Sequence, residues 1–186
     1  MLLVEESNNQ LLNCSDDKTI RLWNLNTGQQ IKQFNGHSYV LGLCKVDKNV
    51  FVSAGGDKSI KIWNMASDTC IHTMDNTHEK WIFSLLYSAS NQVLISASWD
   101  KTVKIWDLKM GEANKKIDKC TLKFTINNPF NNKCCSLAFL DGENGGSRVL
   151  VGDYGGNMFI VDLKTGTCIN KIEKVHSSWI NKLAVG

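Results

Sequence analysis

The sequence lacks long hydrophobic runs, a dominant charge and paired cysteine motifs, and each absence excludes a class of protein. None of its apolar runs approaches the roughly 20 residues of a membrane-spanning helix, and residues 1–4 are too short for a signal peptide because Glu5 and Glu6 follow at once. The net charge of +3 comes from interspersed lysine and aspartate, so no strong field predicts binding to nucleic acid or to an anionic membrane. The seven cysteines include no Cys-x-x-Cys pair, which predicts reduced thiols and a cytoplasmic or nuclear location.

The sequence does contain a short motif that occurs three times and, in a less well-preserved form, a fourth time. The copies occupy residues 16–25, 56–65, 99–108 and 154–163. Their anchor residues recur at intervals of 40, 43 and 55, at Trp23, Trp63, Trp106 and Val161. A period of this size is typical of stacked supersecondary units rather than of one irregular core.

The best-preserved unit, residues 36–74, reads as four short strands with no helical period. Residues 39–46 are mostly apolar, as in a strand buried on both faces, and residues 50–54 form a second strand. Residues 59–63 and 69–74 alternate between polar and apolar, which is typical of half-buried strands. Turn residues separate the strands at 47–49, 55–57 and 64–68. One such meander cannot bury both of its faces, so it is expected to pack against copies of itself.

The Gly36-His37 turn and the dipeptides Trp23-Asn24, Trp63-Asn64 and Trp106-Asp107 resemble the marks of the WD-repeat β-propeller family. The resemblance covers nearly the whole chain and implies an all-β fold of about four four-stranded antiparallel blades. The expected division is a partial first blade at 1–35, a second at 36–76, a third at 77–126, a degenerate fourth at 127–174 and the first strand of a fifth at 175–186.

The number of expected blades leaves two alternatives open. Propellers usually close with 4–8 blades, and the resemblance implies seven as the usual number. The preferred interpretation is therefore a fragment or truncated product of a longer propeller. The other is a closed four-bladed ring in which residues 179–185 supply the innermost strand of the first unit.

Two units carry histidine, serine and aspartate in an order that could suggest a serine hydrolase. No serine lies in a Gly-x-Ser-x-Gly turn, and a catalytic group is needed once, whereas this one recurs. In the family the equivalent residues form a buried hydrogen-bond chain that ends on the tryptophan, so a structural role is expected. The first unit lacks the histidine. The residues concerned are His37, Ser53, Asp57, Trp63, His78, Ser96, Asp100 and Trp106, with Asp17 and Trp23 in the first unit.

The resemblance also implies partner-binding positions in the loops at one end of the propeller, before each turn aspartate and at the start of each innermost strand. Aromatic side chains there suit the anchoring of a peptide or a cation. Trp99 is expected to be exposed, whereas Trp81 and Trp179 could instead pack beneath the loops. The candidate residues are Asp16, Tyr39, Trp81, Trp99, Tyr154 and Trp179.

No metal or cofactor is expected, because neighbouring residues of a strand such as Cys134 and Cys135 point to opposite faces. The leading hypothesis is a non-catalytic scaffold that binds other proteins or peptides within a multiprotein complex, without binding nucleic acid or inserting into a membrane. The alternatives are substrate recognition for a ubiquitin ligase and a truncated product without independent function. A serine hydrolase is disfavoured.

Overall fold

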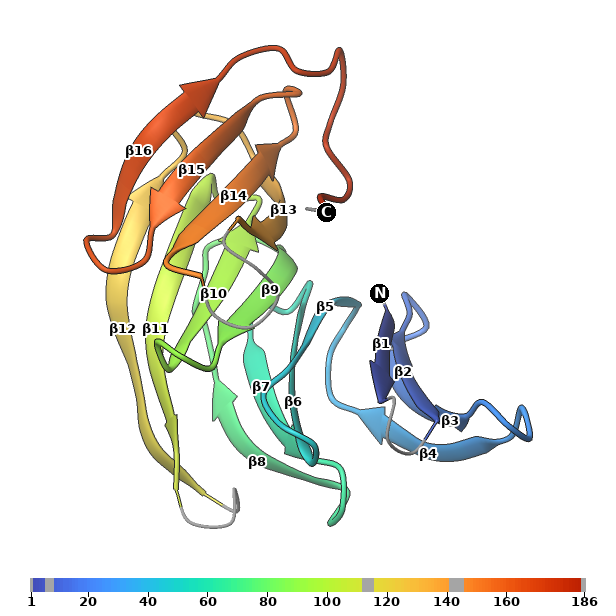
Figure 1. Cartoon of the computed structure of the whole chain (residues 1–186). Helices are drawn as coiled ribbons and strands as arrows, with labels where there is room; N and C mark the ends of the chain where they lie inside the picture. Colours follow the sequence, from blue (N-terminus) through green and yellow to red (C-terminus); the bar gives the residue numbers. More distant parts are fainter. Residues whose placement is uncertain (1, 6–8, 112–115, 141–145, 185–186) are drawn as a thin grey trace.

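The computed structural model describes residues 2–5, 9–111, 116–140 and 146–184, and these form an all-β protein. Their sixteen strands make four antiparallel sheets, each built from four strands that are consecutive in the chain (Figure 1). No helix in this part of the chain has the length and apolar character needed to cross a membrane. The all-β prediction and the prediction of four-stranded blades are confirmed.

Each sheet runs from an innermost to an outermost strand in chain order. The first sheet contains β1 (Leu2–Glu5), β2 (Gln10–Cys14), β3 (Thr19–Asn24) and β4 (Gln30–Asn35). The second contains β5 (Val40–Lys45), β6 (Val50–Gly55), β7 (Ile60–Asn64) and β8 (Thr69–Met74). The third contains β9 (Ile82–Ser88), β10 (Val93–Ser98), β11 (Thr102–Met110) and β12 (Ile117–Asn127). The fourth contains β13 (Cys134–Phe139), β14 (Arg148–Asp153), β15 (Met158–Asp162) and β16 (Thr167–Ile172).

The hydrophobic core lies in three layers between successive sheets. Alternation along β6 places Phe51 toward the first sheet, while Val50 and Val52 pack toward the third. Phe51 meets Phe34 of β4 with ring centroids 5.1 Å apart, and Phe34 lies 5.8 Å from Trp63. Because the second sheet is covered on both faces, all six residues of β6 are buried.

The sheets form an open arc, so the molecule is an incomplete β-propeller (Figure 1). The closed four-bladed ring does not hold, because β1 already provides the innermost strand of the first sheet, with Leu3 opposite Leu12. Residues 173–184 lie instead against the fourth sheet. There the Ile180 amide donates to the Asp153 carbonyl at 3.0 Å, and Ser136 Oγ donates to the Ile180 carbonyl at 2.9 Å.

The segment expected to form the first strand of a fifth blade has no strand between residues 173 and 184. A strand needs a partner for its ladder of hydrogen bonds, and none of the described strands pairs with this segment. Residues 185–186 lie outside the described part of the chain.

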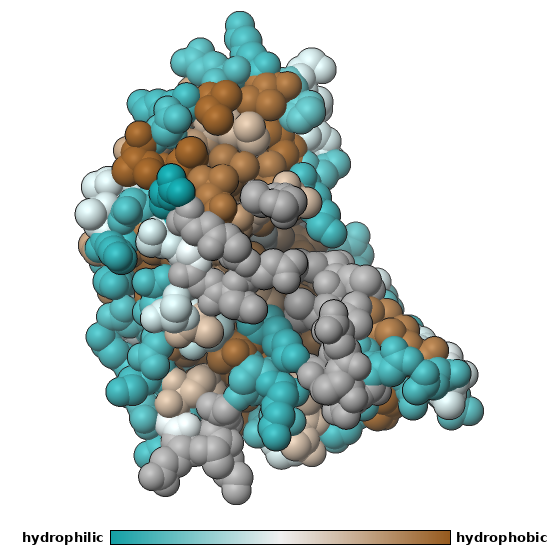
Figure 2. Space-filling model, viewed as in Figure 1, coloured by the Kyte–Doolittle hydropathy of each residue, from teal (hydrophilic) through white to brown (hydrophobic). Residues whose placement is uncertain are grey.

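The outer face of the fourth sheet is largely apolar, and among the described residues no further sheet packs on it; the segment around Ile180 covers only the part near Gly152. Leu150 and Ile160 are cross-strand partners there, as Val52 and Ile62 are in the second sheet. The second-sheet pair has no exposed surface, because the third sheet packs on it, whereas Leu150 and Ile160 are only half-buried. Figure 2 shows the apolar side chains gathered over the region of β14–β16, within a hydrophilic margin.

Candidate functional site

A chain of hydrogen bonds crosses the second sheet from a tryptophan to an aspartate. Trp63 Nε1 donates to Ser53 Oγ at 2.7 Å, and Ser53 Oγ lies 2.7 Å from His37 Nε2. His37 Nδ1 lies 2.9 Å from Asp57 Oδ1. A neutral His37 with its proton on Nδ1 lets every group donate in one direction, from the indole to the carboxylate. Each polar group of the chain is thereby satisfied.

The third sheet repeats this chain and adds further donors to its carboxylate. Trp106 Nε1 donates to Ser96 Oγ at 3.0 Å, Ser96 Oγ lies 2.8 Å from His78 Nε2, and His78 Nδ1 lies 2.8 Å from Asp100. Burial lowers the pKa of His78. Burial opposes ionisation of Asp100, but hydrogen bonds from His78 and Thr102 prevail and hold the pKa of that carboxyl well below its usual range. The pair is therefore a neutral imidazole beside an ionised carboxylate at neutral pH.

These two chains differ from a hydrolase triad in their accessibility. Ser53 and Ser96 have no exposed surface, and each accepts the indole N–H of its tryptophan. A serine nucleophile must reach the scissile carbonyl of its substrate, so this geometry suits a structural role.

The first sheet keeps only part of the pattern. Trp23 Nε1 donates to Asn13 Oδ1 at 3.0 Å, so an asparagine takes the place of the serine. Asp17 is exposed, accepts from Thr19 and pairs with Arg21 at 3.0 Å. Without the histidine, Asp17 and Trp23 are not joined to each other by the hydrogen bonds of the described residues.

The fourth sheet has a different buried carboxylate, Asp153, which the sequence interpretation missed. Asp153 has no exposed surface and accepts from the Gly155 and Asn157 amides, both at 2.8 Å, and from Asn128 Nδ2 at 3.2 Å. Gly155 occupies the usual position of the turn aspartate, and a Cβ there would lie 2.3 Å from Asn132 Nδ2, so a larger residue would displace the Asn132 side chain. The available signal was an aspartate at the end of a strand where the second and third sheets have Gly55 and Ser98.

We expect the free energy of unfolding to decrease as the pH falls below about 6.5, the usual histidine pKa. Burial lowers the folded-state pKa of His78, so the unfolded chain takes up this proton at a higher pH than the folded chain. Below about pH 4 the loss continues, because the pKa values of Asp57 and Asp100 are lowered by folding and the unfolded carboxylates protonate first. Urea unfolding at intervals between pH 7.5 and 3.5 measures this dependence, and a constant unfolding free energy over that range would contradict it.

The loops at one end of the sheets are held by the same backbone hydrogen bond in three sheets. The residue immediately before the innermost strand accepts from the residue that opens the turn after the second strand. The bonds run from the Gly56 amide to the Tyr39 carbonyl at 3.0 Å, from Trp99 to Trp81 at 3.0 Å and from Tyr154 to Lys133 at 2.9 Å. Tyr39, Trp81 and Lys133 are therefore equivalent positions.

A β-bulge follows at the start of each of these innermost strands. The registers of β5, β9 and β13 shift so that Leu41, Phe83 and Cys135 fall outside the regular pairing. Bulges increase the local twist and re-aim side chains. In the third sheet the bulge residue Phe83 stacks on Trp99, with ring centroids 4.4 Å apart.

Six side chains form a continuous row of ring contacts across the second, third and fourth sheets, which we call the aromatic rim. Trp99 is at its centre, stacked on Trp81 at 5.6 Å and on Phe83 at 4.4 Å. Tyr154 meets Trp99 edge-on at 6.1 Å and lies 5.5 Å from Trp179. The rim consists of Tyr39, Trp81, Phe83, Trp99, Tyr154 and Trp179.

The rings of the rim differ in exposure. Tyr39, Trp81, Tyr154 and Trp179 are each between 40% and 44% exposed, so Trp81 and Trp179 do not simply pack beneath the loops. Trp99 is half-buried, which corrects the expectation that it is exposed: the rings on both sides cover it.

The indole N–H of Trp99 is directed into the protein. Among the described residues it has no hydrogen bond of normal geometry. The weak acceptor beside it is the thiol of Cys135, whose pKa burial raises to about 11 while the Trp99 side chain lowers it. Trp99 therefore mainly packs against the neighbouring rings and holds them in place, and little of its own ring is accessible to a ligand.

The candidate Asp16 is exposed on the turn between β2 and β3, and within the described part of the chain no hydrogen bond or ion pair joins it to the rim.

The sequence interpretation missed Lys133, which contacts the rim. Its Nζ lies 4.1 Å from the ring centroid of Trp99 and 4.7 Å from that of Tyr154. The signal was its position immediately before an innermost strand, shared with Tyr39 and Trp81.

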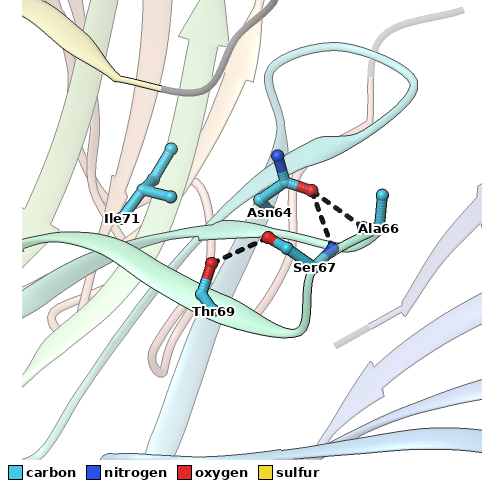
Figure 3. A pocket seen from close by; sticks show the side chains of 5 residues that line it. All are labelled: Asn64, Ala66, Ser67, Thr69 and Ile71. Carbon is cyan, nitrogen blue, oxygen red and sulfur yellow. Dashed lines mark hydrogen bonds between the residues drawn. The ribbon is translucent and has the colours of Figure 1, made fainter.

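A pocket lies at the opposite edge of the second sheet, around the turn between β7 and β8 (Figure 3). Asn64 Oδ1 accepts there from the Ala66 amide at 2.8 Å and the Ser67 amide at 3.2 Å, while the hydroxyls of Ser67 and Thr69 lie 2.8 Å apart. The polar groups of this turn satisfy one another, so the aromatic rim remains the stronger candidate.

Comparison with known families identifies the repeats. The model of the family described as "WD domain, G-beta repeat" matches residues 5–24, 28–64 and 68–107, which together make up more than half of the chain. A comparison with curated proteins found no match. The matched segments belong to the first three sheets, whereas the fourth, which lacks the tryptophan and histidine of the buried chain, lies outside them.

WD repeats indicate a scaffold for protein interactions, and domains built from them typically have no catalytic activity. The four-stranded sheets, their arrangement in an arc and the buried tryptophan-to-aspartate chains agree with the matched segments. The chain belongs to the WD-repeat family and forms an incomplete β-propeller.

Proposed function

We propose that this chain is a non-catalytic scaffold of a larger protein assembly, and that the aromatic rim binds a peptide segment of a partner protein. The observation that supports this most is the unbroken row of ring contacts, in which four rings remain about two-fifths exposed. Large exposed apolar surfaces of this kind are uncommon on isolated proteins and often mark interaction sites.

The construction of the rim favours binding because its rings are already ordered. The repeated backbone hydrogen bond and the stacked rings hold Trp81 and Trp99 in place before a ligand arrives. Little side-chain entropy is then lost on binding. Tryptophan and tyrosine are also the side chains that contribute most often to binding hot spots.

A defined peptide library tests this function. Selection of random 12-residue peptides against the immobilised protein should give binders, whose affinity can then be measured by calorimetry. We expect Trp81→Ala to weaken them by about tenfold, which corresponds to roughly 1.4 kcal/mol.

Ile169→Ala is the matched control, since Ile169 is 51% exposed on β16 and makes no rim contact among the described residues. A thermal melt verifies that both variants are folded. The proposal fails if no peptide is selected, or if the selected peptides bind Trp81→Ala and Trp179→Ala as tightly as the unchanged protein.

A further inference from the structure

We propose that Lys133 makes the aromatic rim selective for acidic peptide segments, namely for an aspartate or glutamate side chain next to an apolar anchor. This inference rests on the proposed function and specifies its ligand. It starts from the position of the Lys133 ammonium, 4.1 Å from the centroid of Trp99 and 4.7 Å from that of Tyr154.

The ammonium already occupies the place that a ligand cation would take. Aromatic faces attract cations, so an unoccupied corner between Trp99 and Tyr154 would suit a lysine or arginine of a partner. With Lys133 lying over both rings, a second cation would have to displace the first or bind beside it against charge repulsion. The corner therefore disfavours basic ligands.

A ligand carboxylate, by contrast, is attracted to this corner. Lys133 is half-buried, and no carboxylate of the described residues pairs with it. Its backbone is fixed by the hydrogen bond from Tyr154, and the two rings limit the freedom of its side chain. An ammonium held in this way can form a charge-assisted hydrogen bond with a ligand carboxylate at little further ordering cost.

The charges around the rim indicate where the acidic residue of the ligand would bind. Asp100 follows Trp99 and Asp153 precedes Tyr154 in the chain, but their carboxylates are turned to His78 and to backbone and asparagine amides, and neither side chain is more than 4% exposed. Exposed carboxylates of the neighbouring loops, Glu79 among them, lie before Trp81 or after β16. Lys101 follows Trp99 in its turn and donates to Asn131 Oδ1 at 3.0 Å.

Lys80 is exposed immediately before Trp81, but among the described residues Lys133 is the lysine whose ammonium lies over rings of the rim, at the corner of Trp99 and Tyr154. The rings of Tyr39 and Trp81 extend away from this corner. An apolar ligand side chain fits the exposed rings, and the neighbouring acidic residue reaches Lys133.

Three matched sets of peptides test the selectivity. Each peptide is acetylated and amidated, carries one tryptophan or leucine anchor, and differs only in having glutamate, glutamine or lysine beside it. We expect the glutamate set to bind about five- to tenfold more tightly than the glutamine set at low salt, and the lysine set to bind most weakly. This preference should shrink as salt is raised.

The variants assign the preference to one residue. Lys133→Met should remove the advantage of glutamate over glutamine while keeping the affinity for the neutral set, and Lys133→Arg should retain it. Lys164→Met is the control, since Lys164 is exposed in the turn between β15 and β16, at the other end of β15 from the rim. Thermal melts verify that all three are folded.

The outcomes separate the two proposals. If no set binds, the proposed function fails. If neutral peptides bind in a manner sensitive to Trp81→Ala but glutamate gives no advantage, or lysine gives one, the selectivity is overturned and the docking surface stands. An advantage of glutamate that persists in Lys133→Met also overturns the assignment.

Discussion

The substitution Asp100→Ala should lower the free energy of unfolding by about 3 kcal/mol. The carboxylate is only 4% exposed and accepts from His78 Nδ1 at 2.8 Å, from the Glu79 amide at 3.0 Å and from the Thr102 amide at 3.0 Å. Alanine leaves these donors without a partner, and each buried, unsatisfied donor costs about 1–3 kcal/mol. Because His78 links the carboxylate to Ser96, the loss extends along the whole chain of hydrogen bonds to Trp106. Urea unfolding at pH 7.5 measures the change.

Asp17→Ala is the matched control for this substitution. Asp17 has the same place in the repeat of the first sheet, but its side chain is 44% exposed and bonds only to nearby groups such as Thr19 and Arg21. Water can replace those partners, so a much smaller change is expected. Equal effects of the two substitutions, or an unchanged urea midpoint for Asp100→Ala, would refute the structural importance of the buried chain.

The second large effect is expected at Asp153. This residue is the buried carboxylate of the fourth sheet, which lacks the tryptophan-to-aspartate chain of hydrogen bonds. Asp153→Ala removes the acceptor of the Gly155 and Asn157 amides and of Asn128 Nδ2, all in a position without exposed surface. We expect a loss of about 2–4 kcal/mol. The turn between β14 and β15 and the segment around Ile180 should open first, since the Asp153 backbone also holds Ile180.

Amide hydrogen exchange followed by mass spectrometry locates this effect. Exchange should accelerate in residues 153–160 and 174–182, while β6 and β7 of the second sheet keep their protection. Asp162→Ala is the control. Asp162 accepts from the Lys164 and Thr165 amides in a more exposed turn, which lies at the other end of β15 from the Asp153 turn. Unchanged exchange around Gly155 in Asp153→Ala would show that the carboxylate does not hold this turn.

The members of the buried chain could be named from the sequence because they recur. His78, Ser96, Asp100 and Trp106 stand in the same order as their counterparts in the second unit, with similar spacing. The structure joins each set through the contacts that the family resemblance implied. In the fourth unit the repetition ends. Asp153 stands at the end of a strand in the sequence, but its position alone did not indicate that the amides of a turn would converge on it.

The rim was only partly predictable for a related reason. Tyr39, Trp81 and Lys133 share one position before an innermost strand, but the long β12 and the following loop shift the spacing before β13 and conceal Lys133. Phe83 enters the rim through a bulge, and Trp99 is covered by rings from two sheets. Neither consequence follows from local spacing.

The sequence by itself determined the all-β repeat, its period and the strand order within each sheet, because alternation and turn residues act over a few neighbouring positions. The tertiary structure decided how the four described sheets are arranged in an arc, that the segment around Ile180 packs on the fourth sheet and that Lys133 lies over Trp99 and Tyr154. These features depend on the rotation from one sheet to the next and on contacts between residues far apart in the chain. No single repeat contains that information.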